Sequence, residues 1–532
     1  MTVVRARRVI TLTEDAAESF AFWGDRVLAT GRFADLREAF PGADVLDAGD
    51  GVIVPGFNDA HMHLAMAADE SLHVDLSPFA VRSLSGLLDR LRQEAERTPP
   101  GQWIRASHYD DGKMPEGRLL TRWDLDEVSR AHPVLVVHVA GHWGVANSLA
   151  LQLGGVDERT APPPGGEFGR DGSGRLNGVL YEQALFDFAY PALARGGRTV
   201  VPETTLEDRL RGLARAVARF HAAGLTSVTD ALVGPRDLEL VQEARRRGLL
   251  TLRVNLLLSA EYYDLLERLR LSTGFGDEHL RFGGVKAFVD GAIGGRTCLL
   301  RDPFEGTEDR GIQRTSTEEL ARIVRRVHQD GNRLCVHANG DRAIEILLDQ
   351  LESAQAACPR PGLAHRIEHC TVVSEDLLVR MRRLGVIAVP FGSYVYYHGG
   401  KLVEWYGAAR VARMFAHRSF LDHGIPVAGS SDYPCGPYEP LVALQSCVTR
   451  RGWDGVVVGE AQRITPLEAL ALYTTGSAYA SGEQDRKGRL APGYLADFVV
   501  LGDDPLAVDP AALGEVEVRA TYVGGRRVWG RG

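Results

Sequence analysis

The sequence predicts an α/β protein built on a (β/α)8 barrel of the TIM type. Short apolar runs recur along the middle of the chain, and each is followed by a stretch with helical periodicity. Both ends of the chain contain short strands with tight turns, and a long segment separates the first barrel strand from the second. We therefore expect a barrel, a small composite β-sandwich from both termini, and a large insertion after the first barrel strand.

Eight apolar runs of strand length supply the expected barrel strands. Helix-like stretches between them include residues 317–331, 343–357 and 375–385. Because a strand-then-helix unit repeats along the chain, a (β/α)8 barrel explains its middle part. The eight runs lie at residues 51–63, 224–231, 252–259, 282–290, 333–340, 364–370, 385–392 and 425–432.

The spacing of these runs is regular except after the first one. About 160 residues separate it from the second run, far more than a βα connection needs. We therefore expect an inserted subdomain at about residues 65–220, inside a barrel domain of residues 56–484. Residues 1–55 and 485–532 share a strand-rich texture, and we expect them to form the composite β-sandwich together.

Composition and charge narrow the class of protein. The chain has 532 residues, with 61 Lys+Arg against 70 Asp+Glu and a formal net charge of −9. A mildly acidic chain has no electrostatic reason to bind nucleic acid. No apolar run is long enough to span a membrane, and the first residues lack the apolar core of a signal peptide, so we expect a cytoplasmic protein. The expected partner is a small-molecule substrate, with homodimer formation left open.

Five polar residues stand where barrel strands end. Barrel enzymes place their chemistry at the carboxyl ends of the strands. Two histidines at positions i and i+2 of one strand point to the same face, so His61 and His63 can bind one metal. Three further candidates close the fifth, sixth and eighth strands: His337, His369 and Asp432. Together they predict a metal site at this rim, whereas His221 and His328 lie in helical patterns and are expected to be structural.

Lysine is rare in this chain, which makes Lys286 informative. Only four lysines occur, none followed by Ser or Thr, so a phosphate-binding loop is excluded. Lys286 lies within the apolar run 285–289 of the fourth strand, where burial favours the neutral amine. A neutral amine can take up carbon dioxide, and the resulting carbamate offers two oxygens that can bridge two cations. The alternative is a buried ion pair between Lys286 and a carboxylate such as Asp290.

The order of these residues carries a family resemblance. An HxH pair followed by Lys, His, His and Asp on strands one, four, five, six and eight resembles the metal-dependent amidohydrolase superfamily. Eight motifs narrow this to the amidohydrolase-3 family, which includes the YtcJ-like proteins and the N-substituted formamide deformylases. The motifs are GFNDAHMHL, GHWGVANSLAL, GRLNGVLYEQAL, VKAFVDGAIGGRTCLL, VHANGDRA, RIEHC, GSSDYP and GRLAPGYLADFVVL.

The resemblance implies a hydrolase with two zinc ions per chain, although other divalent transition metals also suit the residues. His61, His63 and Asp432 would hold one ion, and His337 and His369 the other, with carbamylated Lys286 as the bridge. Hydroxide formed at the metals would attack a substrate carbonyl. Asp432 is the expected catalytic residue, taking the proton and delivering it to the leaving nitrogen.

The implied reaction is cleavage of a non-peptide C–N bond in an amide, an N-formyl compound or a related small molecule. Two alternatives stay open at this point. One is a metal-dependent decarboxylase or isomerase built on the same site. The other is a catalytically silent relative that serves as a binding or regulatory protein.

Weaker candidates surround this set. His142 and Trp143 in the insertion are expected to help close the pocket. The remaining substrate contacts are expected on the loops after strands four and seven: Asp290, Arg296, Tyr394 and Tyr396, the tyrosines having simple packing as the alternative. Arg366 and Glu368 flank His369 but should alternate to the other side of the strand, where we expect an ion pair.

Overall fold

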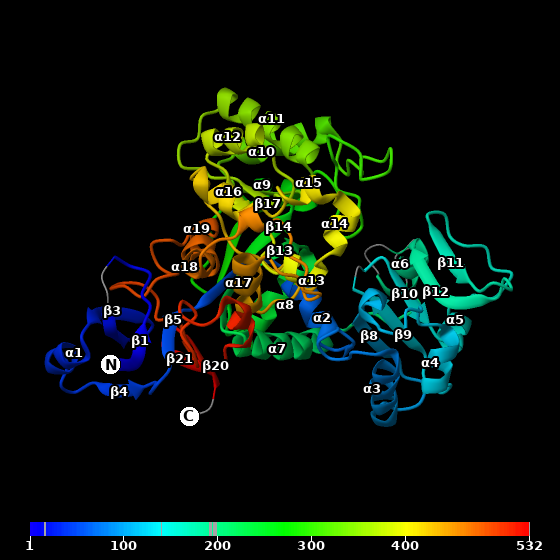
Figure 1. The fold of residues 1–532 in the computed structure, drawn as a ribbon, viewed down its shortest axis with the longest axis horizontal. Coiled ribbons are helices and arrows are strands. Elements are labelled where there is room, and N and C mark those ends of the chain that lie inside the picture. The colour runs from blue at the N-terminus through cyan, green and yellow to red at the C-terminus, as the bar shows by residue number, and fades with distance from the viewer. Residues whose placement is uncertain (15–16, 140, 191–193, 195–198, 531–532) are drawn as a thin grey trace. The chain divides into compact units, whose positions relative to one another are not determined.

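A computed structural model describes residues 1–14, 17–139, 141–190, 194 and 199–530. The chain divides into two compact units, shown in Figure 1. The first unit joins Met1–Ala65 to Ala216–Gly532, and the second is the intervening segment Met66–Arg215. The domain boundaries expected from the sequence, at residues 55, 65, 220 and 485, stay predictions.

The first unit contains a nearly closed parallel barrel. Seven regular strands are found among the described residues, and every neighbouring pair runs parallel. The barrel expected from the sequence is thereby confirmed at the level of its fold. In sheet order the strands are β6 (Phe57–Met62), β13 (Leu225–Val233), β14 (Arg253–Ser259), β15 (Leu280–Phe288), β16 (Leu334–Ala338), β17 (Arg366–His369) and β18 (Ile387–Val389).

The eighth predicted strand, residues 425–432, is not a regular strand, so this detail of the prediction is wrong. Parallel bridges at Ala388–Val427 and Phe391–Ser430 connect this segment to β18 and the residues after it. On its other side, the Ala60 amide donates to the Gly429 carbonyl at 3.0 Å. The segment thus spans the gap between β18 and β6 by isolated hydrogen bonds instead of a continuous ladder.

Amphipathic helices connect the barrel strands. In α10, for example, Leu320, Val324 and Val327 recur at helical spacing and are buried. Helix α11 packs against both α10 and α12, as Figure 1 shows. The helices that follow successive strands are α8 (Pro235–Arg246), α9 (Tyr263–Arg268), α10 (Thr317–Gln329), α11 (Asp341–Ala357), α12 (Glu375–Leu384), α13 (Tyr394–His398), α14 (Lys401–Tyr406), α15 (Ala408–Val411), α16 (His417–Asp422), α17 (Pro440–Thr449), α18 (Pro466–Ala471) and α19 (Ser477–Ala480).

The first predicted strand, residues 51–63, is divided between two sheets. Its first half, β5 (Val52–Pro55), pairs antiparallel with β19 (Phe498–Leu501) near the C-terminus, whereas its second half, β6, belongs to the barrel. The division falls at Gly56, where a Cβ atom would lie 2.3 Å from the Thr226 hydroxyl. A side chain is therefore excluded at the point where the chain passes from one sheet to the other.

Strands from both termini form one composite sheet of eight strands, in the order β21-β20-β19-β5-β1-β2-β3, with β4 paired to β1. The expected joining of the two chain ends is therefore seen, whereas their packing as a sandwich stays a prediction. The strands are β1 (Thr2–Val9), β2 (Ala17–Trp23), β3 (Arg26–Gly31), β4 (Asp44–Asp47), β5 (Val52–Pro55), β19 (Phe498–Leu501), β20 (Val518–Val523) and β21 (Arg526–Gly530); helix α1 (Phe33–Ala39) follows β3.

The second unit has a sheet and an apolar core of its own. The order of its six strands is β11-β12-β10-β9-β8-β7. Leucines of α3 pack with valines of β9 and β10 in one buried cluster. The strands are β7 (Val74–Asp75), β8 (Ile104–Tyr109), β9 (Val134–His138), β10 (Trp143–Ala146), β11 (Gly166–Arg170) and β12 (Leu176–Glu182). The helices are α3 (Leu84–Arg97), α4 (Arg122–Val128), α5 (Ser148–Leu153) and α6 (Gln183–Ala189), while α2 (Leu64–Glu70) and α7 (Leu206–Ala222) lead into and out of the unit.

Within the described ranges, none of the helices combines the length and the apolar character that crossing a bilayer would require.

Candidate metal centre

Three predicted ligands meet at the carboxyl ends of the barrel strands. His61 lies in β6, His369 ends β17, and Asp432 follows the irregular segment that closes the barrel. One ligand atom from each of these side chains lies within 4.8 Å of the others. All three residues are buried. The fold thus brings residues more than 300 positions apart in the sequence to one point.

His63 and His337 lie next to this group. The Nε2 atom of His63 is 3.2 Å from Asp432 Oδ1, and that of His61 is 3.3 Å from the same oxygen. The His337 ring is 4.6 Å from the His369 ring, measured between centroids. Nε2 of His337 also lies 3.0 Å from the Gly291 carbonyl oxygen. All five predicted imidazole and carboxylate ligands therefore belong to one cluster.

Several buried polar atoms of the cluster fit a cation. His61 Nε2, His369 Nδ1 and Asp432 Oδ1 have lost contact with solvent, and none of them makes a hydrogen bond. The approaches of 3.2 and 3.3 Å to Asp432 Oδ1 lack hydrogen-bond geometry. Buried polar atoms in folded proteins are nearly always hydrogen-bonded, because an unmade bond costs about 1–3 kcal/mol. Imidazole nitrogens and a carboxylate oxygen are donors that Zn²⁺ and related ions accept. The donor set therefore fits a divalent transition metal.

Glu368 orients His61, a contact that the sequence did not predict. The buried Glu368 accepts a hydrogen bond from His61 Nδ1, with 2.5 Å between Oε2 and the nitrogen. The proton therefore lies on Nδ1, and the lone pair of Nε2 faces the cluster. Arg366 holds the same carboxylate through two hydrogen bonds of 2.7 and 2.8 Å. The expected ion pair is present, but the expectation that it lies away from the site is wrong.

The reason is a change of backbone direction at the end of β17. His369 has φ of +69° and Cys370 has φ of +44°, in the left-handed region that non-glycine residues seldom adopt. The simple alternation of side chains ends there, so the neighbouring Glu368 and His369 both reach His61. Asp432, another member of the cluster, also has a left-handed φ of +55°. Such conformations concentrate at functional sites.

Lys286 is buried in β15, as expected, with 1% of its surface exposed. Burial lowers the pKa of its amine to about 8, against the attraction of Glu368 and Asp432. Among the described residues no carboxylate lies within ion-pair distance of Lys286. Asp290, the partner in the alternative interpretation, instead accepts hydrogen bonds from the Leu299, Asn339 and Gly340 amides at 2.8–3.0 Å.

The electrostatics of the cluster suit metal ligands. Burial, aided by the charge of Lys286, lowers the pKa of His337 to about 3, and burial lowers that of His369 well below its ordinary value. Both imidazoles are therefore neutral at pH 7. Burial raises the pKa of Asp432, but the surrounding histidines outweigh it, so this carboxyl stays ionised. Neutral imidazole and ionised carboxylate are the forms that bind metals.

The loop candidates have individual positions. The Asp290 side chain is fully buried and bound to backbone amides, while Arg296 has a left-handed φ of +51° and stacks over Phe304 at 5.4 Å. Tyr394 is buried, and its ring lies 4.3 Å from Phe391, which itself stacks on His369 at 4.3 Å. The Tyr396 amide bonds to the Ser446 hydroxyl. Substrate contacts by these residues stay predictions.

His142 and Trp143 belong to the second unit. His142 Nδ1 lies 3.0 Å from Glu182 Oε2, and both side chains are about half exposed. Trp143, in β10, stacks on His138 with 4.4 Å between ring centroids. Their expected part in closing a pocket stays a prediction.

The sequence did not single out two buried carboxyl groups near the predicted metal ligands. Asp59 precedes His61 by two residues on β6, and Asp230 accepts the Leu64 amide at 3.0 Å. Burial raises the pKa of each to about 7. An isolated Asp in an apolar run was the available signal in both cases, but it gives no indication of a partner.

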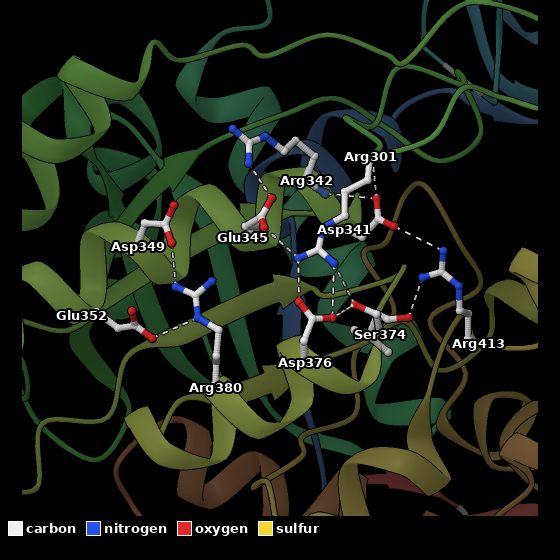
Figure 2. Close-up of polar contacts among 11 residues, drawn as sticks. Arg301, Asp341, Arg342, Glu345, Asp349, Glu352, Ser374, Asp376, Arg380 and Arg413 are labelled. Carbon is white, nitrogen blue, oxygen red and sulfur yellow. Dashed lines mark hydrogen bonds and ion pairs between the residues drawn. The ribbon is translucent and has the colours of Figure 1, made fainter.

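Asp341, which follows strand β16 and the predicted ligand His337, belongs to a polar network (Figure 2). It accepts the Arg301 amide at 2.8 Å and a bond from Arg413 at 3.3 Å. The Arg301 guanidinium in turn binds Glu345 at 2.9 Å and Asp376 at 2.8 Å. This network fastens the loop after β15 to helices α11 and α12.

Fold and site together define a barrel protein whose functional groups converge at the carboxyl ends of its strands. The model of the Amidohydrolase family matches residues 44–529. The chain therefore belongs to the amidohydrolase family, which confirms the resemblance of its motifs.

Individual relatives agree over nearly the full length. The chain is 30% identical over 509 residues to a putative amidohydrolase YtcJ of Bacillus subtilis (strain 168), covering 94% of each chain. It is 30% identical over 530 residues to an N-substituted formamide deformylase of Arthrobacter pascens, covering 97% of this chain and 96% of the relative. An uncharacterized metal-dependent hydrolase of Pyrococcus horikoshii OT3 superposes with a TM-score of 0.76 at 26% identity, covering 96% of this chain and 99% of the other.

Proposed function

We propose that this protein is a metal-dependent hydrolase that cleaves a non-peptide C–N bond in an amide, an N-formyl compound or a related small molecule. The observation that carries the proposal is the convergence of unpartnered buried atoms of His61, His369 and Asp432. Family membership supports it, as does the activity in the name of the Arthrobacter relative, a deformylase of N-substituted formamides.

In this proposal the site holds two zinc ions. His61, His63 and Asp432 would hold one, and His337 and His369 the other, with a carbamate on Lys286 as the bridge. The donor chemistry supports zinc, because imidazole and oxygen ligands suit this ion. The burial of Lys286 supports the carbamate, because it favours the neutral amine that takes up carbon dioxide.

When bound, the metal ions polarise the substrate carbonyl and lower the pKa of a water molecule. Asp432 accepts the proton that this water gives up while the water oxygen bonds to the carbonyl carbon. The same carboxyl then delivers the proton to the nitrogen as the C–N bond breaks, leaving a carboxylic acid and an amine. Glu368 keeps the lone pair of His61 Nε2 directed into the site throughout.

Metal analysis combined with a substrate screen tests the proposal. Purified protein should contain up to two equivalents of divalent transition metal, and a chelator should remove metal and activity together. The screen uses formamides, ureas, carbamates and N-acyl compounds and follows amine release. Full turnover by demonstrably metal-free protein would exclude the metal-dependent scheme. Tight metal binding without turnover of any compound would favour the silent binding relative, and carbon dioxide release without amine would favour a decarboxylase.

Lys286→Arg tests the bridge, with Lys401→Arg on the exposed start of α14 as the matched control. Arginine conserves charge but forms no carbamate, so the first variant should lose most activity and the second none. A short carboxylic acid added to Lys286→Ala should restore part of the rate by occupying the vacant position. Parent-like turnover by Lys286→Arg would exclude the carbamate.

A further inference from the structure

Phe288 forms an aromatic platform beside the metal ligands. It lies two residues after Lys286 on β15, so both side chains point to the same face of the strand. The Phe288 ring is 5.3 Å from the His337 ring between centroids, and Lys286 Nζ lies 4.9 Å from the Phe288 centroid. A group held over this ring is therefore one side chain away from His337, a predicted metal ligand.

Arg314 is held over that ring. Its guanidinium carbon lies 4.2 Å from the Phe288 centroid, within the range of a cation–π contact. Its backbone is fixed as well, because the Arg314 amide donates to the Val289 carbonyl at 2.8 Å. The preceding Gln313 also forms an isolated antiparallel β-bridge with Asp290. The side chain is exposed, yet both its base and its cation have defined positions.

The guanidinium donors of Arg314 have no acceptor in the part of the chain that the structure describes. Glu318 and Glu319, in the first turn of the adjacent α10, form no ion pair with it. Arg301, on the same loop, gives the contrast: its donors are taken up by Glu345 and Asp376, as Figure 2 shows. Stacking on an aromatic ring engages the face of a guanidinium and leaves its in-plane N–H groups able to bind a carboxylate in bidentate fashion.

We propose that Arg314 is the subsite for a carboxylate on the substrate, so that the protein acts on N-acyl or N-formyl compounds bearing an acid group close to the scissile amide. This inference rests on the proposed function, because it assigns the substrate class of the same site. A carboxylate on the substrate would supply the guanidinium of Arg314 with the acceptor that the described residues do not provide.

Two probes that differ only in the carboxylate test the specificity. N-formyl-L-phenylalanine carries the acid, and N-phenethylformamide lacks it. The parent protein should prefer the acid in kcat/KM. In Arg314→Met, which keeps much of the aliphatic length, this preference should fall about 10- to 100-fold, the range for loss of a charged hydrogen bond. The control is Arg310→Met, an exposed arginine of the same loop without the aromatic platform, which should keep the preference of the parent.

A non-hydrolysable pair separates this inference from the proposed function. N-methylsulfonyl-L-phenylalanine and N-phenethylmethanesulfonamide can be titrated by calorimetry into the metal-loaded protein. Tighter binding of the acid by the parent, lost in Arg314→Met and retained in Arg310→Met, would support the carboxylate subsite even if no amide were hydrolysed. Equal binding of both probes by the parent, or binding of neither, would overturn it, whatever the outcome of the substrate screen.

Discussion

The two ends of the barrel use the same residue types in opposite ways. At the carboxyl ends of the strands, His61, His369 and Asp432 direct polar atoms at one another without a hydrogen-bond partner. At the amino ends, His328 and His365 form a closed chain. The Leu334 amide donates to His365 Nδ1 at 3.1 Å, His365 Nε2 lies 2.9 Å from His328 Nδ1, and His328 Nε2 lies 2.7 Å from the Cys358 carbonyl.

Charged residues differ in the same way. Arg253, at the start of β14, binds Asp497 through two hydrogen bonds of 2.7 and 3.0 Å, and both side chains are buried. Such a pair stabilises the junction between the barrel and the terminal sheet but offers no atom to a ligand. The unpartnered atoms of the ligand cluster favour a bound cation, whereas the hydrogen-bonded His328–His365 chain and the Arg253–Asp497 pair stabilise the fold.

The largest expected effect tests the catalytic end. Asp432→Asn removes the group that accepts and delivers the proton in the proposed reaction, so kcat should fall by about 10²–10⁴. Metal should largely remain, because the four histidines and the carbamate of the proposed site would be unchanged, and KM should change much less than kcat. Steady-state kinetics on amides with a range of leaving groups, together with metal analysis, checks this. Near-normal kcat at full metal content would reduce Asp432 to a ligand.

The next effect should appear in stability alone. Arg253→Met leaves the buried Asp497 without its cationic partner, although the Gly524 amide still donates to it at 2.7 Å. The free energy of unfolding should therefore fall by about 3–5 kcal/mol. The exposed pair of Arg519 with Asp50 is the control, since Arg519→Met should cost no more than about 1 kcal/mol. Urea unfolding measures both, while kcat should stay at the parent value. A large drop in kcat of the folded Arg253→Met protein would contradict the interpretation that residues at the amino ends of the strands serve stability alone.

A smaller effect should link the two roles. Glu368→Gln weakens the orientation of His61 and should reduce metal affinity about 10- to 100-fold. The matched control is Glu483→Gln, which removes a buried charge that is paired with Lys487 and Arg281. Within the described part of the chain, Glu483 forms no hydrogen bond or ion pair with a predicted ligand, so metal affinity should stay unchanged. Competition with a fluorescent chelator gives the affinity. Equal losses in both variants would show that a general loss of stability is responsible.

The smallest effect should appear in how the stability of the protein depends on pH. Burial, followed by the charges of His328 and Arg333, lowers the pKa of His365 to about 3, below the ordinary value of 6.5. The folded protein therefore binds fewer protons than the unfolded chain between these values, so stability should fall as pH drops from about 6.5 to about 3. In His365→Asn the free energy of unfolding should fall less steeply with decreasing pH, by the slope that corresponds to about one proton. Urea unfolding at pH 4–7 measures this slope. The surface variant His423→Asn should not, and equal slopes for parent and His365→Asn would contradict the assignment.

The sequence predicted much of the fold because periodicity is local. Apolar runs fixed the positions of β13, β14, β15, β16, β17 and β18 to within a few residues. The predictions from the sequence were wrong where contacts between distant segments determine how a strand pairs. The run 51–63 reads as one strand, but the close approach of Thr226 to Gly56 divides it between two sheets. Residues 425–432 read as a strand, yet they pair through isolated bonds only.

What the sequence determined by itself was which residues are candidate ligands and their order along the chain; that they bind metal stays a prediction. His61, His63, Lys286, His337, His369 and Asp432 each follow or belong to an apolar run, and strand ends of one barrel share one rim. The tertiary structure decided how these groups are oriented and paired. Glu368 lies 307 residues from His61, so no spacing rule could predict their contact. The left-handed backbone at His369 lets the adjacent side chains of Glu368 and His369 both reach His61. Orientation and hydrogen-bond partners depend on contacts between distant segments, and that is why they became known only from the folded chain.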